Sequence, residues 1–346
     1  MKKLWAFIFL FSFFYVQSPA PVGIQNLANT CYMNALLQCL IASKKFVGLM
    51  QSINFASVTD ENTKNLGNTF KNFVIQHAAG NNRNEPTNPQ EFAACVNMQG
   101  IFTGDVIKEQ QDSDELFIKL IRLLGEEKKD LLDFFTIKSE TRLTPACLQK
   151  MAIAFTDTEE EQEDIVLRLP LSADSLDDCI KNFFGKKKSD IYCNNCRQQA
   201  CVDQEIFITH YPELLVILLG RRDEKGKKIT KKITINPNNS LIGSYEYKLI
   251  GCVFHAGTGT GGHYTAVIKK DSAWYECNDT YVNHLTLTKA QEILNGENTE
   301  SYLLFFEKVK EVQLHAQKIQ DITNLLMQTQ NYIRGLYVNT SLFAFK

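Results

Sequence analysis

The chain has 346 residues, 44% of them hydrophobic, which is enough for one large domain or two with a substantial core. Its 37 Lys and Arg nearly balance its 39 Asp and Glu, so the formal net charge is -2. This balance excludes the broad basic surface of a nucleic-acid-binding protein, and the spacing of the ten cysteines does not resemble a disulfide framework. We therefore expect a globular protein with no nucleic-acid partner.

The N-terminal segment 1–20 differs in composition from the rest of the chain. Two lysines precede an apolar run over residues 4–16. This run is shorter than the roughly 20 residues that span a membrane, and it matches the apolar core of a signal peptide, about 7–15 residues long. Small residues follow, although Pro21 would hinder cleavage there. The segment predicts a signal peptide or a short uncleaved membrane anchor; a buried hydrophobic flap is the alternative.

The segment 23–40, GIQNLANTCYMNALLQCL, places a cysteine where a polar loop turns into a patterned helix. Apolar residues recur at i, i+3, i+4 and i+7 over residues 33–40, which predicts one apolar helix face. Asn29 or Thr30 is a suitable N-cap, so Cys31 falls in the first turn, where the helix dipole lowers the pKa of a thiol. A nucleophile and a small buried apolar side chain both fit this position.

The middle of the chain alternates helical and strand patterns. The expected helices cover residues 90–98, 112–124 and 175–184, and the expected strands cover residues 165–169, 201–208 and 214–219. On the second of these helices, Asp112 and Glu115 are spaced i and i+3, so one helix face presents both carboxylates.

The segment 247–282 supplies the groups that a thiol nucleophile needs. An apolar strand leads into a glycine-rich stretch that ends at His263, and a later strand ends at Asn278 and Asp279. A catalytic thiol needs a base for its proton, and the base needs an acceptor that fixes its tautomer. His263 and either Asn278 or Asp279 fit these roles, in the order found in thiol proteases.

These segments resemble the ubiquitin-specific proteases, a family of papain-like deubiquitinating enzymes. The cysteine segment matches the family box G-L-x-N-L-G-N-T-C-Y-x-N-x-x-L-Q except at Ile24 and Ala28, where Leu and Gly are usual. The histidine segment contains the family's G-H-Y, a following Trp and N-D, and residues 110–116 (QQDSDEL) resemble Q-Q-D-A-H-E-F. The resemblance covers about residues 23–307.

The resemblance implies an α+β fold of the papain-like cysteine protease class. It places a USP-type catalytic domain at 21–308, after the N-terminal segment 1–20 and before a C-terminal helical extension at 309–346. Within the domain it implies three parts, a helical thumb at about 21–130, antiparallel β fingers at about 131–215 and a β palm at about 216–308.

The resemblance also implies a role for each matched residue of the catalytic centre. Cys31 is expected to be the nucleophile, and His263 the general base and then the general acid. Asn278 occupies the third triad position, and the neighbouring Asp279 is expected to assist it or to substitute for it. Asn26 occupies the position of the oxyanion-hole donor, which stabilises the charge that develops on the attacked carbonyl.

The implied reaction is hydrolysis of the (iso)peptide bond after the C-terminal Gly of ubiquitin or a ubiquitin-like modifier on modified proteins. Asp112 and Glu115 match acids that hold the basic tail of ubiquitin; a solvated helix surface is their alternative. Two other function classes stay open: an inactive fold that only binds ubiquitin, and a thiol enzyme acting on another modifier or peptide.

The expected fingers depart from the family at a zinc site. Many members bind zinc with two CxxC pairs. The second pair is present here as Cys193 and Cys196, but the first is only Cys147 with Lys150 in place of the other cysteine. Three thiolates are too few for a closed structural site unless Cys201 completes it. We therefore expect no metal cofactor.

The signal-like segment on an enzyme for a cytosolic eukaryotic modifier implies export, with the cytosol of a host cell as a possible destination. Anchoring to a membrane through residues 4–16 is the alternative.

Overall fold

The computed structural model describes residues 20–80, 85–145, 157–158, 161–193, 198–258, 261–296 and 300–312. The apolar run 4–16, Cys147, Cys196 and nearly all of the C-terminal extension lie outside these residues. The chain divides into two compact units, one formed by residues 1–127 and 250–293, and the other by 128–249 and 294–346. The boundaries of thumb, fingers and palm stay a prediction.

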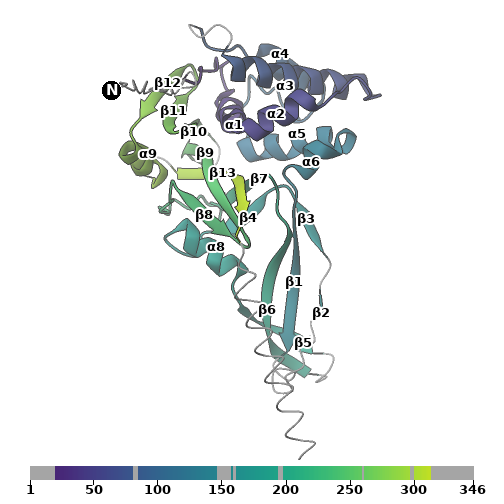
Figure 1. Ribbon diagram of the computed structural model, residues 1–346, viewed down its shortest axis with the longest axis vertical. Coiled ribbons are helices and arrows are strands. Elements are labelled where there is room, and N and C mark those ends of the chain that lie inside the picture. Colours follow the sequence, from purple (N-terminus) through teal and green to yellow (C-terminus); the bar gives the residue numbers. More distant parts are fainter. Residues whose placement is uncertain are drawn as a thin grey trace, which may run out of the picture. The chain divides into compact units, whose positions relative to one another are not determined.

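Unit 1 combines helices with an antiparallel set of strands (Figure 1). Its helices are α1 (Cys31–Ala42), α2 (Lys44–Ser52), α3 (Glu61–Ala79), α4 (Gln90–Met98), α5 (Ser113–Glu127) and α9 (Leu287–Leu294). Its strands are the end of β9 (Tyr245–Gly257), then β10 (Gly262–Lys270), β11 (Ala273–Asn278) and β12 (Tyr281–Leu285).

The register of these strands places the residues of the predicted site at the same end of the sheet. β10 pairs with β9 on one side and with β11 on the other. Ala266 lies opposite Cys277, so the start of β10 and the end of β11 come to the same end of the sheet. His263 is the second residue of β10 and Asn278 the last residue of β11. The antiparallel pairing therefore brings together two residues that are far apart along their hairpin.

Helix α1 is the centre of unit 1. It contacts α2, α3 and α5, and it also packs against β10 and β11. Every residue over 31–40 is buried, so the helix has no exposed face in this stretch, whereas its sequence pattern predicted a single apolar face. Burial of each Leu side chain contributes roughly 1.5–3 kcal/mol. The polar side chains that share this burial must find partners inside the protein.

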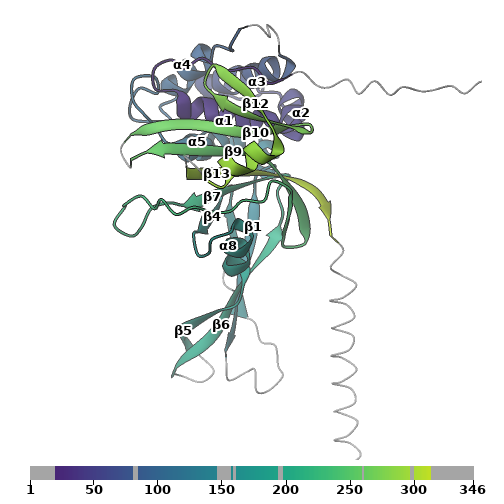
Figure 2. The same cartoon turned by 90° about the vertical axis from the view of Figure 1, so that its left-hand side faces the viewer.

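Unit 2 contains most of the remaining strands (Figure 2). One sheet runs in the order β2-β1-β6-β5, with β3 also paired to β1. These strands are β1 (Ile137–Pro145), β2 (Asp157–Thr158), β3 (Gln162–Asp164), β5 (Lys187–Cys193) and β6 (Gln198–His210). A second group contains β4 (Leu167–Pro170), β7 (Leu214–Gly220), β8 (Asn239–Ile242), the start of β9 and β13 (Glu300–Glu311).

Packing in unit 2 follows the apolar runs of its strands. Most of β7 is buried, and this strand pairs in parallel with β4 and antiparallel with β13. Helix α8 (Leu176–Phe184) contacts β4 and β6, and α6 (Lys129–Asp133) precedes β1. The predicted α8 is capped by Ser175, whose side chain accepts a hydrogen bond from the Asp178 N–H. No helix in the described part of the chain is both long and apolar enough to cross a membrane.

A buried histidine in unit 1 helps to hold the segment that leads into the predicted active site. His77 of α3 is only 5% exposed, and its Nδ1 lies 2.8 Å from the Thr87 hydroxyl. The backbone of Thr87 in turn bonds Gly23 and Gln25, just before Asn26. Burial, with a smaller contribution from Lys270, lowers the pKa of His77 to about 4. The neutral imidazole is therefore the form that fits the fold.

We expect the stability of the protein to fall as pH drops from about 6.5 to about 4. Below pH 6.5 the unfolded chain binds a proton at His77, whereas in the folded chain His77 stays neutral until the pH reaches about 4. Protons therefore favour unfolding in this window. The loss approaches about 3 kcal/mol at the low end, from the size of the pKa difference. Urea unfolding at several pH values measures it. His77→Gln should flatten the slope, and equal slopes in both proteins would contradict the assignment.

Candidate active site

The loop before Cys31 is closed by its own side chains. Asn26 Oδ1 accepts hydrogen bonds from the N–H groups of Ala28 and Thr30, each at 3.1 Å. The Thr30 hydroxyl accepts from the Leu27 N–H at 3.0 Å. Thr30 is the N-cap residue of α1, one of the two predicted candidates, but its side chain makes no cap hydrogen bond to the first turn, and Asn26 instead accepts from the N–H groups just before the helix.

Ala28 occupies a backbone conformation that suits glycine. Its φ of 109° lies where a Cβ atom is unfavourable. The family box that the cysteine segment resembles has Gly at this position, and Gly adopts a positive φ without a steric cost. The protein therefore stores backbone strain in the loop that positions Asn26.

Cys31 lies at the first position of α1 and is only 4% exposed. Burial raises the pKa of its thiol, and the negative charge of Asp279 raises it further. The backbone N–H groups of Tyr264, Tyr32 and Cys31 itself lower it, but the net direction is upward. The sequence-based expectation of a lowered thiol pKa is therefore wrong for the resting protein, because loss of water outweighs the amides at the helix start.

His263 and Asn278 form a direct hydrogen bond. His263 Nε2 lies 2.8 Å from Asn278 Oδ1. An amide oxygen only accepts hydrogen bonds, so Nε2 carries the proton and Nδ1 keeps a free lone pair. Asn278 is thus placed to select the tautomer in which Nδ1 can accept a proton.

The Asp279 carboxylate accepts hydrogen bonds from residues other than His263. Its Oδ2 accepts from Asn26 Nδ2 at 2.8 Å, and its Oδ1 accepts from Asn34 Nδ2 at 2.7 Å. Its φ is 52°, in the left-handed region, and its backbone oxygen accepts from the Ile24 N–H. Asp279 therefore joins the loop before Cys31 to α1. Sequence reasoning missed this role, although Asn34 belongs to the cysteine box.

The two acids at Asp112 and Glu115 line one small cavity of about 130 Å³. Asp112, just before α5, accepts a hydrogen bond from the Tyr264 hydroxyl at 2.6 Å, and Glu115 pairs with Lys119 at 2.6 Å. His255 lines the same cavity and stacks on the Tyr264 ring with 4.5 Å between the centroids. Small-molecule pockets are usually about 300–1,000 Å³, so this space suits a narrow chain better than a bulky ligand.

The zinc prediction is not tested by the described residues. Cys193 ends β5, while Cys147 and Cys196 lie outside the described ranges. Within those ranges, no three His, Cys, Asp or Glu side chains are grouped so that they could hold a metal ion.

Comparison with known proteins identifies the family. The family model described as "Ubiquitin carboxyl-terminal hydrolase" matches residues 22–306. The chain belongs to this family. Its members are cysteine peptidases that act on ubiquitin.

Similar proteins differ from this chain over most of their residues. It is 23% identical over 327 residues to the human "Ubl carboxyl-terminal hydrolase 18", covering 84% of this chain and 85% of that protein. It is 26% identical over 328 residues to "Ubiquitin carboxyl-terminal hydrolase 25" of Arabidopsis thaliana, covering 83% of this chain and 47% of that protein.

Solved structures confirm the α+β, papain-like fold of ubiquitin-specific proteases. A chain in the SAGA Ubp8/Sgf11/Sus1/Sgf73 DUB module bound to ubiquitin aldehyde matches with a TM-score of 0.70 and 21% identity. The match covers 84% of this hydrolase and 70% of that chain. The same module with Ubp8(C146A) bound to monoubiquitin matches with a TM-score of 0.67.

Replacing Ala28 by Gly should stabilise the hydrolase by about 1 kcal/mol. The change relieves strain worth about 1–3 kcal/mol and costs roughly 0.5–1 kcal/mol in the extra entropy of the unfolded chain. Denaturant unfolding of both proteins measures the difference. The control is Ala94→Gly, at an exposed position of helix α4, which should destabilise the protein because it carries the same entropic cost without relieving strain. A loss of stability with Ala28→Gly would show that the loop is unstrained.

Proposed function

We propose that this hydrolase is a thiol-dependent deubiquitinase that cleaves the (iso)peptide bond after the C-terminal Gly of ubiquitin or a ubiquitin-like modifier. The observation that carries the proposal is the His263–Asn278 hydrogen bond, which leaves Nδ1 free to accept a proton. In the proposal Cys31 is the nucleophile, His263 the base and then the acid, and Asn278 the residue that orients the imidazole.

The reaction follows from these roles. His263 Nδ1 takes the proton from the Cys31 thiol as the sulfur attacks the carbonyl carbon of the terminal Gly. The resulting imidazolium then gives its proton to the departing lysine amine, and a thioester remains on Cys31. Water, deprotonated by His263, hydrolyses the thioester and regenerates the thiol. Because the resting thiol has a raised pKa, this proton transfer is needed at neutral pH.

Asn26 is the proposed donor to the oxyanion formed in each step. Its Nδ2 has two hydrogens, and one is committed to Asp279. The other remains for the developing negative oxygen. Its Oδ1 bonds to Ala28 and Thr30 hold the amide plane in place, so the donor is oriented before substrate binds.

The cavity lined by Asp112 and Glu115 is the proposed site for the modifier's C-terminal tail. Its carboxylates favour a basic segment, and its small volume favours residues without bulky side chains. The relatives' names support both modifier classes: one is a Ubl hydrolase, whereas the matched Ubp8 module was solved with ubiquitin. Ubiquitin and ubiquitinated proteins are our first choice of partner.

We further propose that the N-terminal segment directs export, with a host-cell cytosol as the destination and membrane anchoring as the alternative. The support is its two lysines followed by the apolar run 4–16. Fractionation of the producing organism with sequencing of the mature N-terminus tests this. Recovery only from the producer's cytosol, with residue 1 retained, would refute it.

Ubiquitin with a thiol-reactive group at its C-terminus should form a covalent adduct with the full chain. The warhead needs both a reactive thiol and a site shaped for the modifier, so the mass should rise by one ubiquitin. Cys31→Ala should abolish the adduct and the turnover while retaining ubiquitin binding. Hydrolysis by this variant would indicate another nucleophile. Adducts with a ubiquitin-like probe alone would reassign the modifier.

Substitutions at Asn278 and Asp279 should both slow turnover, but by different routes. Asn278→Ala frees the imidazole, whereas Asp279→Ala releases Asn26 and should lower kcat by up to roughly 100- to 1000-fold, the effect of losing one oxyanion donor.

Asp279→Ala also removes a charge that raises the thiol pKa, so alkylation of Cys31 should begin at lower pH. Asn278→Ala should not do this. A loss of kcat with Asp279→Ala that leaves the His263 tautomer unchanged would support the donor role of Asn26. A changed His263 tautomer in Asp279→Ala would instead make Asp279 the third triad residue.

A further inference from the structure

The strand that carries His263 receives a pair of hydrogen bonds from a side chain in a distant loop. Gln110 Nε2 donates to the Gly262 carbonyl oxygen, and Gln110 Oε1 accepts from the Gly262 N–H, both at 2.9 Å. One amide therefore binds both polar groups of a single backbone residue. Gly262 directly precedes His263 along the chain.

This contact replaces a missing strand neighbour. β11 pairs with β10 over Ala266–Lys270, so the start of β10 extends beyond the paired residues. The N–H and C=O of one residue in an antiparallel strand point to the same side. At Gly262, the Gln110 amide supplies on that side the two hydrogen bonds that a neighbouring strand would give. The position of His263 is thereby fixed from the open edge of the sheet.

Gly262 has no room for a side chain. A Cβ atom there would overlap the Ala256 carbonyl oxygen and the His255 imidazole. The backbone at this point is thus packed closely against β9 on one side and bonded to Gln110 on the other. A displacement of Gly262 would move His263 with it.

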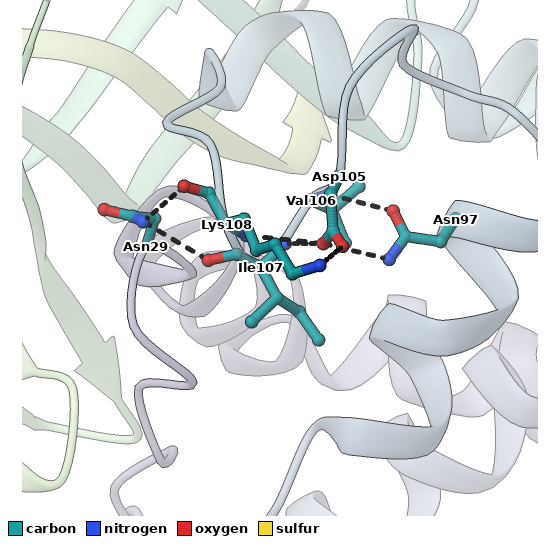
Figure 3. Close-up of polar contacts among 6 residues, drawn as sticks. All are labelled: Asn29, Asn97, Asp105, Val106, Ile107 and Lys108. Atoms are coloured by element: carbon teal, nitrogen blue, oxygen red, sulfur yellow. Dashed lines mark hydrogen bonds and ion pairs between the residues drawn. The ribbon is translucent and has the colours of Figure 1, made fainter.

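The loop that carries Gln110 is itself held by hydrogen bonds at residues 105–108, which Figure 3 shows. Asn29 Nδ2 donates to the carbonyl oxygens of Ile107 at 3.3 Å and Lys108 at 2.9 Å. The Asp105 carboxylate accepts from the N–H groups of the same two residues, at 2.9 and 3.3 Å. Asn97 of α4 bonds both Asp105 and Val106. The loop is therefore fixed to α4 and to a residue two positions before Cys31.

We propose that Gln110 is a positioning residue that holds the general base: through its paired hydrogen bonds to Gly262 it sets His263 relative to Cys31. This inference rests on the proposed function of Cys31 and His263. Asn29 links the loop to the nucleophile's side of the site, and Gln110 links it to the base. The two reacting groups thus share one rigid polar connection besides the packing of α1 on β10.

The test compares Gln110→Met, which keeps the length of the side chain but loses both hydrogen bonds, with Gln110→Ala. The control is Thr103→Ala, at an exposed position of the same loop. Hydrolysis of a ubiquitin C-terminal aminocoumarin amide gives kcat and KM. Both Gln110 variants should lower kcat by roughly 10- to 100-fold, as expected for a small misplacement of a catalytic group, with KM little changed. Thermal unfolding checks that each variant is folded.

A second measurement does not depend on the modifier. The rate of Cys31 alkylation by iodoacetamide, followed by mass spectrometry from pH 4 to 10, reports how His263 interacts with the thiol. We expect the Gln110 variants to shift this profile toward that of an isolated thiol, and Thr103→Ala to leave it unchanged. If the wild type fails to cleave the ubiquitin amide but the profile still shifts, the proposed substrate is wrong and the positioning role stands.

Three outcomes would overturn the positioning role. One is wild-type turnover in folded Gln110→Met, which would show that the hydrogen bonds are unnecessary. Another is a raised KM with unchanged kcat, which would make Gln110 a contact for the modifier's tail. The third is an unchanged alkylation profile in both variants.

Discussion

The arrangement of the active site depends on the burial of residues 31–40 of helix α1 on every side. A helix buried on all sides cannot leave its polar side chains in water, and α1 carries two amides, Asn34 and Gln38. Asn34 Nδ2 donates to the Gln25 carbonyl and to Asp279, and Gln38 Nε2 donates to the Val22 carbonyl. Both side chains therefore bind the segment that leads to Asn26. The same hydrogen bonds give partners to both buried amide nitrogens and hold the segment that carries Asn26, the proposed oxyanion donor, whereas Asn34 Oδ1 has no hydrogen-bond partner among the described residues.

The same network fixes the turn that follows Asn278. Asp279 lies between α1 and the loop before Cys31, and its backbone oxygen accepts from Ile24. A Cβ atom on Gly23 would overlap the Thr280 carbonyl, so the N-terminal segment passes close against this turn. The neighbouring Asn278 is consequently presented to His263 from an anchored position. The Asp279 carboxylate thus supports the position of the amide that is hydrogen-bonded to His263.

Local sequence patterns predicted the helix and strands of the site better than the hydrogen bonds that connect them. The strand that ends at Asn278 and the helix that begins at Cys31 follow from short-range apolar periodicity and match the structure, whereas His263, expected at the end of the glycine-rich stretch, is the second residue of β10. The roles of Asn29, Asp279 and Gln110 do not follow from any pattern, because each side chain bonds a backbone or side-chain group far away in sequence. Cap preference alone favoured Asn29 and Thr30 for the helix start, but other partners took both side chains.

The pKa of the Cys31 thiol is a second property that the local sequence did not predict. Position in the first turn of a helix predicts a stabilised thiolate, since nearby N–H groups favour negative charge. Burial depends on what packs over that turn, which the local sequence does not specify, and here it reverses the direction. Asp279 adds to the rise while holding Asn26 in place. A carboxylate at this position therefore disfavours the free thiolate while it binds the amide of Asn26, the proposed oxyanion donor. In the proposed mechanism the thiol stays protonated at rest and passes its proton to His263 as the sulfur attacks, and Asn26 then donates to the oxyanion that forms on the attacked carbonyl.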